Sequence, residues 1–289
     1  MEPSGAAAEE GSPLVSRPVP ADWLALRRAA DHRAREKSQL LMHRLGRHLA
    51  GISTQPVRVV DVGAGTGSNQ AWLAPRLGVD QHWILVDHDE ALIRSAETLT
   101  STSPQVSTQR EVGAIEDLPG LLNPAPALVT CAALLDLLTA AEAQTLVRAV
   151  AAPGAAALLS LTVTGAVQIS PADPEDSLIA GAFDAHQRRG GILGPEAADV
   201  VADLFTGEGM GVTVQETDWE LSAEDADLMR RYLTDRAAVA VEQDSRLTQT
   251  AEAWVSRRLQ QVERNQLMIR VGHTDLLALP GASVAVAEA

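Results

Sequence analysis

The chain has 289 residues, of which 46% are hydrophobic, so it can bury a sizeable core as one large domain or as two small ones. Its net charge of −15 repels phosphate and argues against a nucleic-acid partner unless a strong local basic patch overcomes that repulsion. The single cysteine, Cys131, excludes an intrachain disulfide framework and a multi-cysteine metal site. The seven histidines show no metal-ligand spacing, and we predict no metal.

The sequence carries no signal for export or for membrane insertion. Its first residues do not combine a basic start with an apolar core, and no run reaches the ~18 apolar residues of a membrane span. We therefore expect a cytoplasmic protein without a membrane anchor.

The N-terminal region divides into two parts. Residues 1–18 are rich in Gly, Ser, Pro, Ala and Glu and are expected to form a disordered tail. Residues 19–52 have the spacing of one or two amphipathic helices, with seven basic against three acidic side chains. This basic segment is interpreted either as a solvated helix face or as a helix that lies over the site and offers cations to an anionic substrate.

From residue 57 the pattern alternates between strand and helix. Strands are predicted at 57–62, 82–87, 105–111, 126–131, 155–163, 210–216 and 266–273. Helices are predicted at 69–77, 89–99, 115–121, 139–151, 175–188 and 195–206. Regular alternation implies right-handed crossovers and a parallel sheet covered on both faces. The prediction is a Rossmann-like, doubly wound α/β fold.

A helical insertion is predicted before the last strand, at residues 222–264. We treat residues 53–289 as one domain that contains this insertion. The insertion and the N-terminal helices are expected to roof the pocket or to make a contact in a homodimer.

The stretch from Val57 to Asn69 carries the strongest signal for a ligand. A β-branched run passes through Asp61 into three glycines, Gly63, Gly65 and Gly67, and then into a helical segment. Glycines there allow a ligand to lie against bare main chain, and the first amides of the helix face it.

An acid ends the second predicted strand. Asp87 lies twenty residues after Gly67, where a carboxylate can accept hydrogen bonds from a ribose diol. A nicotinamide or flavin dinucleotide fits poorly, because its fingerprint requires a glycine at the position that Ser68 occupies.

The sequence Asp61-Val-Gly63-Ala-Gly65-Thr-Gly67, followed by Asp87, resembles class I S-adenosylmethionine-dependent methyltransferases. The order of seven strands, mostly parallel with an antiparallel last strand, is similar to that family's fold. The resemblance implies that the glycine turn, with Ala64, carries the methionine part of S-adenosylmethionine, that Asp61 lies near its amino end and that Asp87 holds its ribose. The cofactor's carboxylate, ammonium and diol suit helix-start amides, Asp61 and Asp87 respectively.

Other residues are expected beside the cofactor. The family clamps the adenine with an acid and a small apolar residue before a Leu-Pro pair; here Ala114 stands at the acid's position and Ile115 follows it. His88 and Cys131, at the ends of the second and fourth strands, complete this set. For Cys131, packing in the core is the alternative interpretation.

The acceptor side has fewer signals. The chain more loosely resembles an actinobacterial subgroup of the family, with Leu134-Leu135-Asp136 and a segment from Phe183 to Arg189. Asp136 and His186 are the candidate catalytic residues, the histidine because it can accept a proton near neutral pH. The candidate substrate-binding residues are Asp184, Arg188 and Arg189. His273 and Asp275 are expected to lie far from the cofactor.

Three further hypotheses accompany a small-molecule methyltransferase. One is an RNA methyltransferase that uses the basic helices, and another is a non-catalytic regulator or partner subunit that binds the cofactor. The third is a dehydrogenase, which the glycine spacing disfavours.

Overall fold

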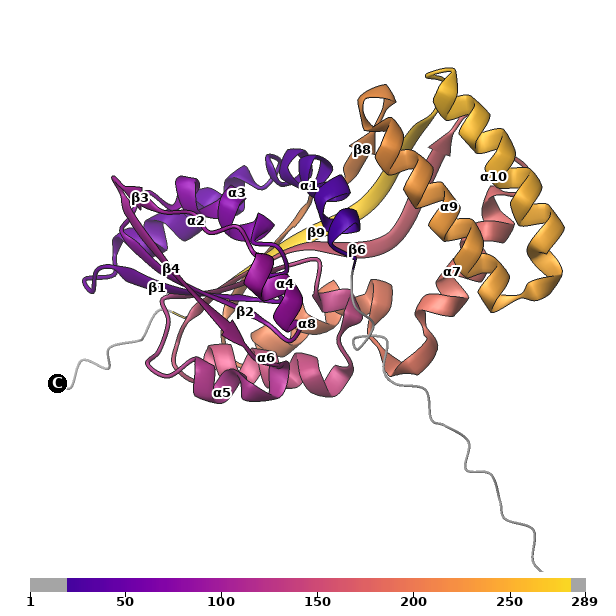
Figure 1. The fold of residues 1–289 in the computed structure, drawn as a ribbon. Coiled ribbons are helices and arrows are strands. Elements are labelled where there is room, and N and C mark those ends of the chain that lie inside the picture. The colour runs from indigo at the N-terminus through magenta and orange to yellow at the C-terminus, as the bar shows by residue number, and fades with distance from the viewer. Residues whose placement is uncertain (1–19, 282–289) are drawn as a thin grey trace, which may run out of the picture.

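The computed structural model describes residues 20–281, and the predicted tail at 1–18 lies outside them. Its centre is a nine-stranded sheet in the order β3-β4-β2-β1-β5-β6-β9-β7, with β8 paired to β9 (Figure 1). The strands are β1 (Val57–Val62), β2 (Gln81–Asp87), β3 (Ser101–Thr102), β4 (Gln105–Val112), β5 (Leu128–Ala132), β6 (Ala156–Ser170), β7 (Gly211–Glu216), β8 (Trp219–Leu221) and β9 (Met268–Leu279).

Five neighbouring strands, β4, β2, β1, β5 and β6, run parallel, and β9 lies antiparallel between β6 and β7. The chain moves from β1 through β2 to β4 on one side and then crosses to β5 on the other side of β1. Strand order therefore reverses at β1, and a crevice forms outside its carboxyl end.

The predicted sheet of seven strands is wrong in number, since the sheet has nine. The two additional strands, β3 and β8, have two and three residues and are too short to give an alternating pattern. Strands β6 and β9 also continue well beyond the predicted 155–163 and 266–273.

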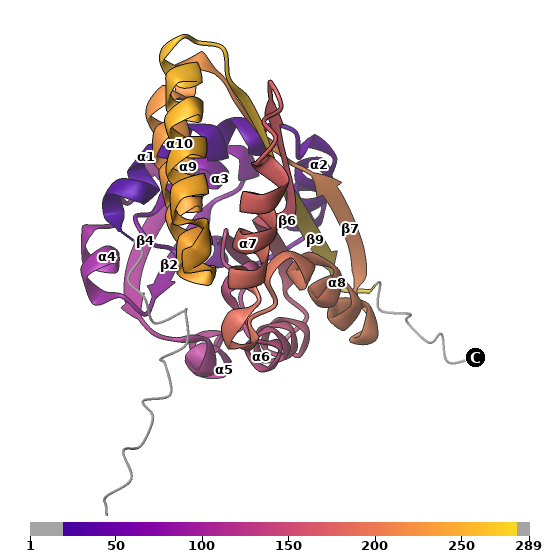
Figure 2. The ribbon, with the colours of Figure 1, turned by 90° about the vertical axis from the view of Figure 1, so that its right-hand side faces the viewer.

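Helices cover both faces of the sheet (Figures 1 and 2). One hydrophobic cluster includes Leu45 and Trp72, and another includes Leu146 and Phe205 on the opposite face. The helices are α1 (Ala21–Arg35), α2 (Gln39–Ala50), α3 (Ser68–Leu77), α4 (Glu90–Ser95), α5 (Leu118–Leu121), α6 (Ala140–Ala151), α7 (Asp176–Gln187), α8 (Ala197–Gly207), α9 (Ala226–Gln243) and α10 (Thr248–Glu263). Short 3₁₀ turns are η2 (Ile115–Asp117), η3 (Leu135–Leu137), η4 (Arg189–Gly191), η5 (Gly194–Glu196), η6 (Ala223–Asp225) and η7 (Ser245–Leu247).

Two helix ends follow from specific hydrogen bonds. Thr139 and Glu142 form the predicted capping box at the start of α6, where the Glu142 amide donates to Thr139 Oγ1 at 3.3 Å. Helix α4 ends at Ser95, short of the predicted 99, because the chain turns so that the Glu97 amide donates to the Thr66 carbonyl at 3.0 Å.

A third core cluster lies beyond the main sheet. The outer halves of β6 and β9 extend past the parallel strands and pack with α7, α9 and α10 around Leu233 and Trp254 (Figures 1 and 2). We call β8, α7, α9, α10 and these outer strand halves the helical lobe. Within residues 20–281, no helix is both long and apolar enough to cross a bilayer.

Candidate active site

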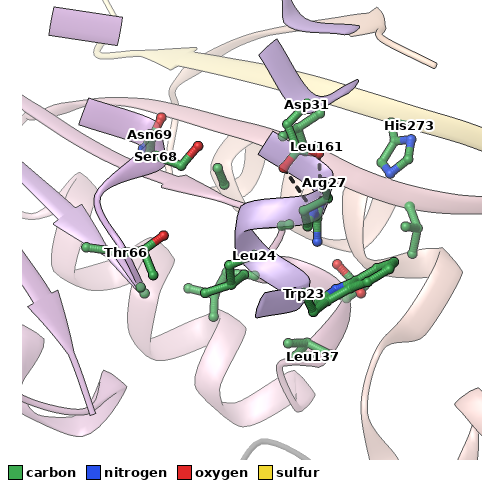
Figure 3. Close-up of a pocket in the computed structure, with 18 of the residues that line it drawn as sticks. Trp23, Leu24, Arg27, Asp31, Thr66, Ser68, Asn69, Leu137, Leu161 and His273 are labelled. Atoms are coloured by element: carbon green, nitrogen blue, oxygen red, sulfur yellow. Dashed lines mark hydrogen bonds and ion pairs between the residues drawn. The ribbon is translucent and has the colours of Figure 1, made fainter. Parts of the chain in front are cut away.

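A cavity of about 460 Å³ lies at the carboxyl ends of the strands, between the glycine turn, α1 and the helical lobe (Figure 3). Its volume is in the range of pockets that enclose small ligands. One face of α1 covers it, because Trp23, Leu24, Arg27, Asp31 and Arg35 recur at helical spacing along its wall.

The glycine turn forms the floor of the cavity. Gly63, Gly65 and Gly67 have φ values of 67°, 52° and 84°, a left-handed region that side chains strongly disfavour. A Cβ on Gly67 would lie 2.2 Å from the Glu97 carbonyl oxygen, so the turn is also too close to its neighbour for a side chain. Gly63, Ala64 and Gly65 line the cavity, and Gly67 shapes the turn from behind.

Asp87 fixes the turn and borders the cavity. Its Oδ2 accepts the Gly65 amide at 2.8 Å and its Oδ1 accepts the Asp89 amide at 2.9 Å. The half-exposed His88 ring beside it lies 3.4 Å from the same carboxylate and also lines the cavity. Each carboxylate oxygen can accept a second hydrogen bond, so Asp87 can hold a ribose while holding the turn.

A buried polar cluster lies next to the start of α3. Asp61 accepts the Asn69 side-chain amide at 2.6 Å, and burial raises the pKa of Asp61 to about 7. Arg35, only 1% exposed, stacks over the Trp72 ring at 4.0 Å, and burial lowers its pKa. Within the described residues, Asp61 Oδ2, Asn69 Oδ1 and Arg35 Nε and Nη2 have no hydrogen-bond partner.

The remaining residues predicted beside the cofactor lie outside the cavity wall. Ala114 begins the turn η2, where its amide donates to Asp117 at 3.0 Å, and Ile115 packs in the core. Cys131 is 1% exposed in the same core, and burial raises the pKa of its thiol. The packing interpretation of Cys131 therefore agrees with its surroundings.

The acceptor side of the cavity has an aromatic wall built from three elements. The Asp31 carboxylate accepts hydrogen bonds from the Arg27 guanidinium at 2.8 and 3.1 Å (Figure 3). It also accepts the Trp219 indole N–H at 2.9 Å, which ties α1 to β8. The Arg27 guanidinium lies over the Trp219 ring at 5.1 Å, and the His273 ring is tilted against that indole at 5.0 Å.

His273 lines this cavity, and the prediction that it lies far from the cofactor site is wrong. The predicted last strand ended at His273, whereas β9 continues to Leu279, so His273 sits in mid-strand opposite Val163 of β6. Its Nδ1 lies 2.9 Å from the Val271 carbonyl and donates to it, which leaves Nε2 as an acceptor. Burial and nearby Arg27 lower its pKa to about 4, so the ring is neutral at pH 7.

Asp275 holds the wall in place from behind. Its carboxylate accepts the Ser38 hydroxyl at 2.6 Å, the Leu161 amide at 2.8 Å and the Thr217 hydroxyl at 2.9 Å. Leu161 sits at a bulge of β6 with φ of 58°, and this conformation turns it into the cavity.

Asp136 lines the cavity just after β5. Its Oδ1 is buried without a hydrogen-bond partner among the described residues, and burial raises the pKa of this carboxyl to about 6. Asp136 also borders a smaller cavity of about 110 Å³, to which Asp184 contributes.

The structure does not bring His186, Arg188 and Arg189 to either of these cavities. The His186 Nε2 lies 3.3 Å from Glu242 of α9, and its ring is 5% exposed. Arg188 is exposed and lies 3.9 Å from Glu196, and Arg189 reaches the Gln243 carbonyl at 3.5 Å. His186 and Gln187 are the last two residues of α7, and of this motif only Gln187 lines both cavities.

Several cavity residues carry no motif in the sequence. Arg35, Trp219, Tyr232 and His273 come from four elements that meet only in the folded chain. The spacing of Trp23, Arg27 and Arg35 on one helix face is the signal that could have placed α1 over the site. Among residues 20–281, no group of three or more His, Cys, Asp or Glu side chains could hold a metal ion.

Comparison with known proteins adds family evidence. A family model described as a methyltransferase domain matches residues 59–153. No curated protein matches the sequence. The fold is similar to that of a cyclopropane-fatty-acyl-phospholipid synthase-like protein from Lactobacillus casei, at 15% identity over 91% of this chain and 94% of that one, with a TM-score of 0.52.

A second solved structure is more distant. An S-adenosylmethionine-dependent methyltransferase from Geobacter sulfurreducens, in complex with S-adenosylhomocysteine, is 14% identical over 91% of this chain and 98% of that one, with a TM-score of 0.40. Together, the matched domain, the glycine turn with Asp87 and the strand order agree on one class of domain and one cofactor. The protein therefore carries a class I S-adenosylmethionine-dependent methyltransferase domain.

Proposed function

We propose that this protein transfers the methyl group of S-adenosylmethionine to a small molecule bound between α1, the end of β5 and the helical lobe. The observation that carries the proposal is that one cavity joins the glycine turn and Asp87 to an apolar, aromatic chamber. Methyl transfer from a sulfonium is an in-line displacement, so a site must chiefly hold the acceptor atom on the line of the breaking bond.

The orphaned polar atoms next to α3 fit the amino-acid part of the cofactor. Arg35 would bind its carboxylate, and Asp61 with Asn69 would bind its ammonium group, which would satisfy every orphaned atom of this cluster. Asp87 would hold the ribose hydroxyls, and bare main chain at Gly63 and Gly65 leaves room for the rest. When bound, the cofactor supplies the electrophilic methyl group.

On the acceptor side, Asp136 would take the proton that the acceptor loses. Its pKa of about 6 leaves the carboxylate ionised and available at neutral pH. His273, held neutral with Nε2 as an acceptor, would orient an O–H or N–H of the acceptor. The aromatic wall of Trp219 suits an apolar or aromatic molecule.

The pairing of the N-terminal cations argues against RNA as the substrate. Arg28 pairs with Glu97, Arg33 with Asp225 and Lys37 with Glu220, so these basic side chains of the helices are neutralised by acids. A strong fall of any RNA binding with rising salt would contradict this interpretation.

The finer resemblance to an actinobacterial subgroup stays a prediction that rests on the two motifs quoted above.

The test is calorimetry with S-adenosylhomocysteine, followed by incubation of the protein with methyl-labelled cofactor and a metabolite extract. We expect binding by the wild type, weaker binding by Asp87→Asn and a labelled product of low molecular weight. Binding without a labelled product would favour the non-catalytic hypothesis, and binding of NAD instead would favour a dehydrogenase.

A further inference from the structure

One buried arginine of the helical lobe has no ion-pair partner within residues 20–281. Arg236 of α9 is 4% exposed, and its guanidinium stacks over the Phe183 ring at 4.2 Å. Its Nη1 donates to the Tyr232 hydroxyl at 3.2 Å, whereas Nη2 is buried with no partner in residues 20–281. A buried cation is costly unless an anion compensates it, so this position suggests a ligand that supplies one.

Arg236 lines the smaller cavity of about 110 Å³. This side cavity shares Asp136, Leu137 and Tyr232 with the main cavity, so a molecule in the main cavity can extend one group into it. Its other walls are largely apolar and include Val167 and Pro195. The side cavity has room for a single small group.

The other two arginines that line the cavities are either paired or located at the cofactor end. Of the three arginines that line the two cavities within the described residues, Arg27 is paired with Asp31, and Arg35 lies by Asp61 at the cofactor end. Arg188 and Arg189, predicted to bind the substrate, lie outside both cavities. Arg236 is the remaining cation that faces the acceptor side.

We infer that Arg236 binds a carboxylate of the methyl acceptor, and hence that the acceptor is a small carboxylic acid with an apolar or aromatic body. This inference rests on the proposed function. Arginine presents a planar pair of donors that matches a carboxylate. A dianionic phosphate fits less well, because Arg236 is the one arginine that lines this cavity in residues 20–281 and compensates a single negative charge, whereas the second charge would be left next to Asp136 and Asp184.

The placement of the two charged groups also orients the acceptor. Arg236 lines only the side cavity, whereas Asp136 lines both. An acid anchored at Arg236 therefore directs the rest of the molecule past Asp136 towards the glycine turn. The O–H or N–H that gains the methyl group is the part that passes Asp136.

The experiment uses the full-length protein saturated with S-adenosylhomocysteine and four probes that share one ring: benzoate, benzyl alcohol, benzylamine and phenyl phosphate. Calorimetry should show that benzoate binds most tightly. Arg236→Met should lower the affinity for benzoate about tenfold or more while leaving the affinities for benzyl alcohol and S-adenosylhomocysteine unchanged. Arg230→Met, an exposed arginine of the same helix paired with Asp227, is the matched control and should change nothing.

Other outcomes would overturn the inference. Tighter binding of benzylamine that disappears in Asp184→Asn would make the side cavity a cation site, and tighter binding of phenyl phosphate would make it a phosphate site. Unchanged benzoate affinity in Arg236→Met, or no benzoate binding at millimolar concentration, would also refute it. If Arg236→Met does not fold, Arg236→Lys keeps the charge without the planar donors and should still weaken benzoate. Failure to bind S-adenosylhomocysteine would instead refute the proposed function.

Discussion

The two halves of the cavity are assembled in different ways. The cofactor half is built mainly from one βαβ unit, in which residues 61–69 and 87–92 supply the turn, the ribose acid and the helix start. The acceptor half draws its residues from five separate elements, α1, β6, β8, α9 and β9, among them Trp219, Tyr232 and His273. Local sequence therefore constrains the first half, whereas long-range packing creates the second.

This comparison has a consequence for mutations. Changes in the acceptor half should alter transfer without altering cofactor affinity, and changes in the cofactor half should alter affinity first. Four predictions can break or sharpen that separation.

The largest effect is expected from Asp136→Asn. Loss of the proton acceptor should lower kcat about 10²–10⁴-fold, with S-adenosylhomocysteine affinity unchanged. At saturating cofactor, the wild-type rate should rise with pH through about 6, because the Asp136 carboxyl must lose its proton before it can accept one. The variant should lack this rise, and Asp199→Asn, an exposed acid of α8, is the control. A wild-type pH profile retained by the variant would assign the base elsewhere.

The next effect is on stability, at Gly67. Alanine in a left-handed conformation costs about 1–2 kcal/mol, and at Gly67 the new Cβ must also displace the Glu97 carbonyl 2.2 Å away. Gly78→Ala is the matched control, since Gly78 has φ of 69° and a Cβ added there would meet no atom within 4 Å. Urea unfolding should show a larger loss for Gly67→Ala, with weaker cofactor binding in that variant alone. Equal losses of unfolding free energy in the two variants would mean that the close approach of Gly67 to the Glu97 carbonyl does not contribute to the effect.

Arg35→Met should weaken the binding of S-adenosylhomocysteine by about 1.5–3 kcal/mol, on the order of 10–100-fold. The reason is that the charged hydrogen bonds from Arg35 to the carboxylate of the ligand are lost. Arg76→Met is the control, since Arg76 lies over the same Trp72 ring at 4.4 Å but does not line the cavity. Calorimetry on both variants separates the two arginines. The same loss in both would indicate a packing effect on Trp72.

The smallest effect is a pH dependence of cofactor affinity. In the cofactor-free protein, burial raises the pKa of Asp61 to about 7, and only the ionised carboxylate can pair with an ammonium group. Affinity for S-adenosylhomocysteine should therefore fall as pH drops below about 7, by up to about tenfold per unit. Asp61→Asn should bind weakly at every pH, and a steep dependence in that variant would point to another group.

The same contrast explains what the sequence could predict. The glycine turn, Asp61 and Asp87 are set by local backbone requirements, and the structure places the first two turn glycines and Asp87 at the cavity. His186 had a suitable side chain, but nothing local to it revealed that it would pack against α9. The predicted position of His273 was wrong because β9 is paired on both sides. The length of that strand depends on β6 and β7, which lie far away in the sequence.

The hydrogen bonds of the Asp275 carboxylate also have a consequence for folding during translation. It bonds Ser38, 237 residues earlier in the chain, and so fastens the junction of α1 and α2 to β9, the last of the strands to be synthesised. The β1–α3–β2 unit can form from nearby residues during translation. The helix that covers it already contacts Ser68 and Trp72, but its junction with α2 is fastened only when β9 emerges, so we expect a nascent chain to hold an incompletely closed cofactor site through most of its synthesis.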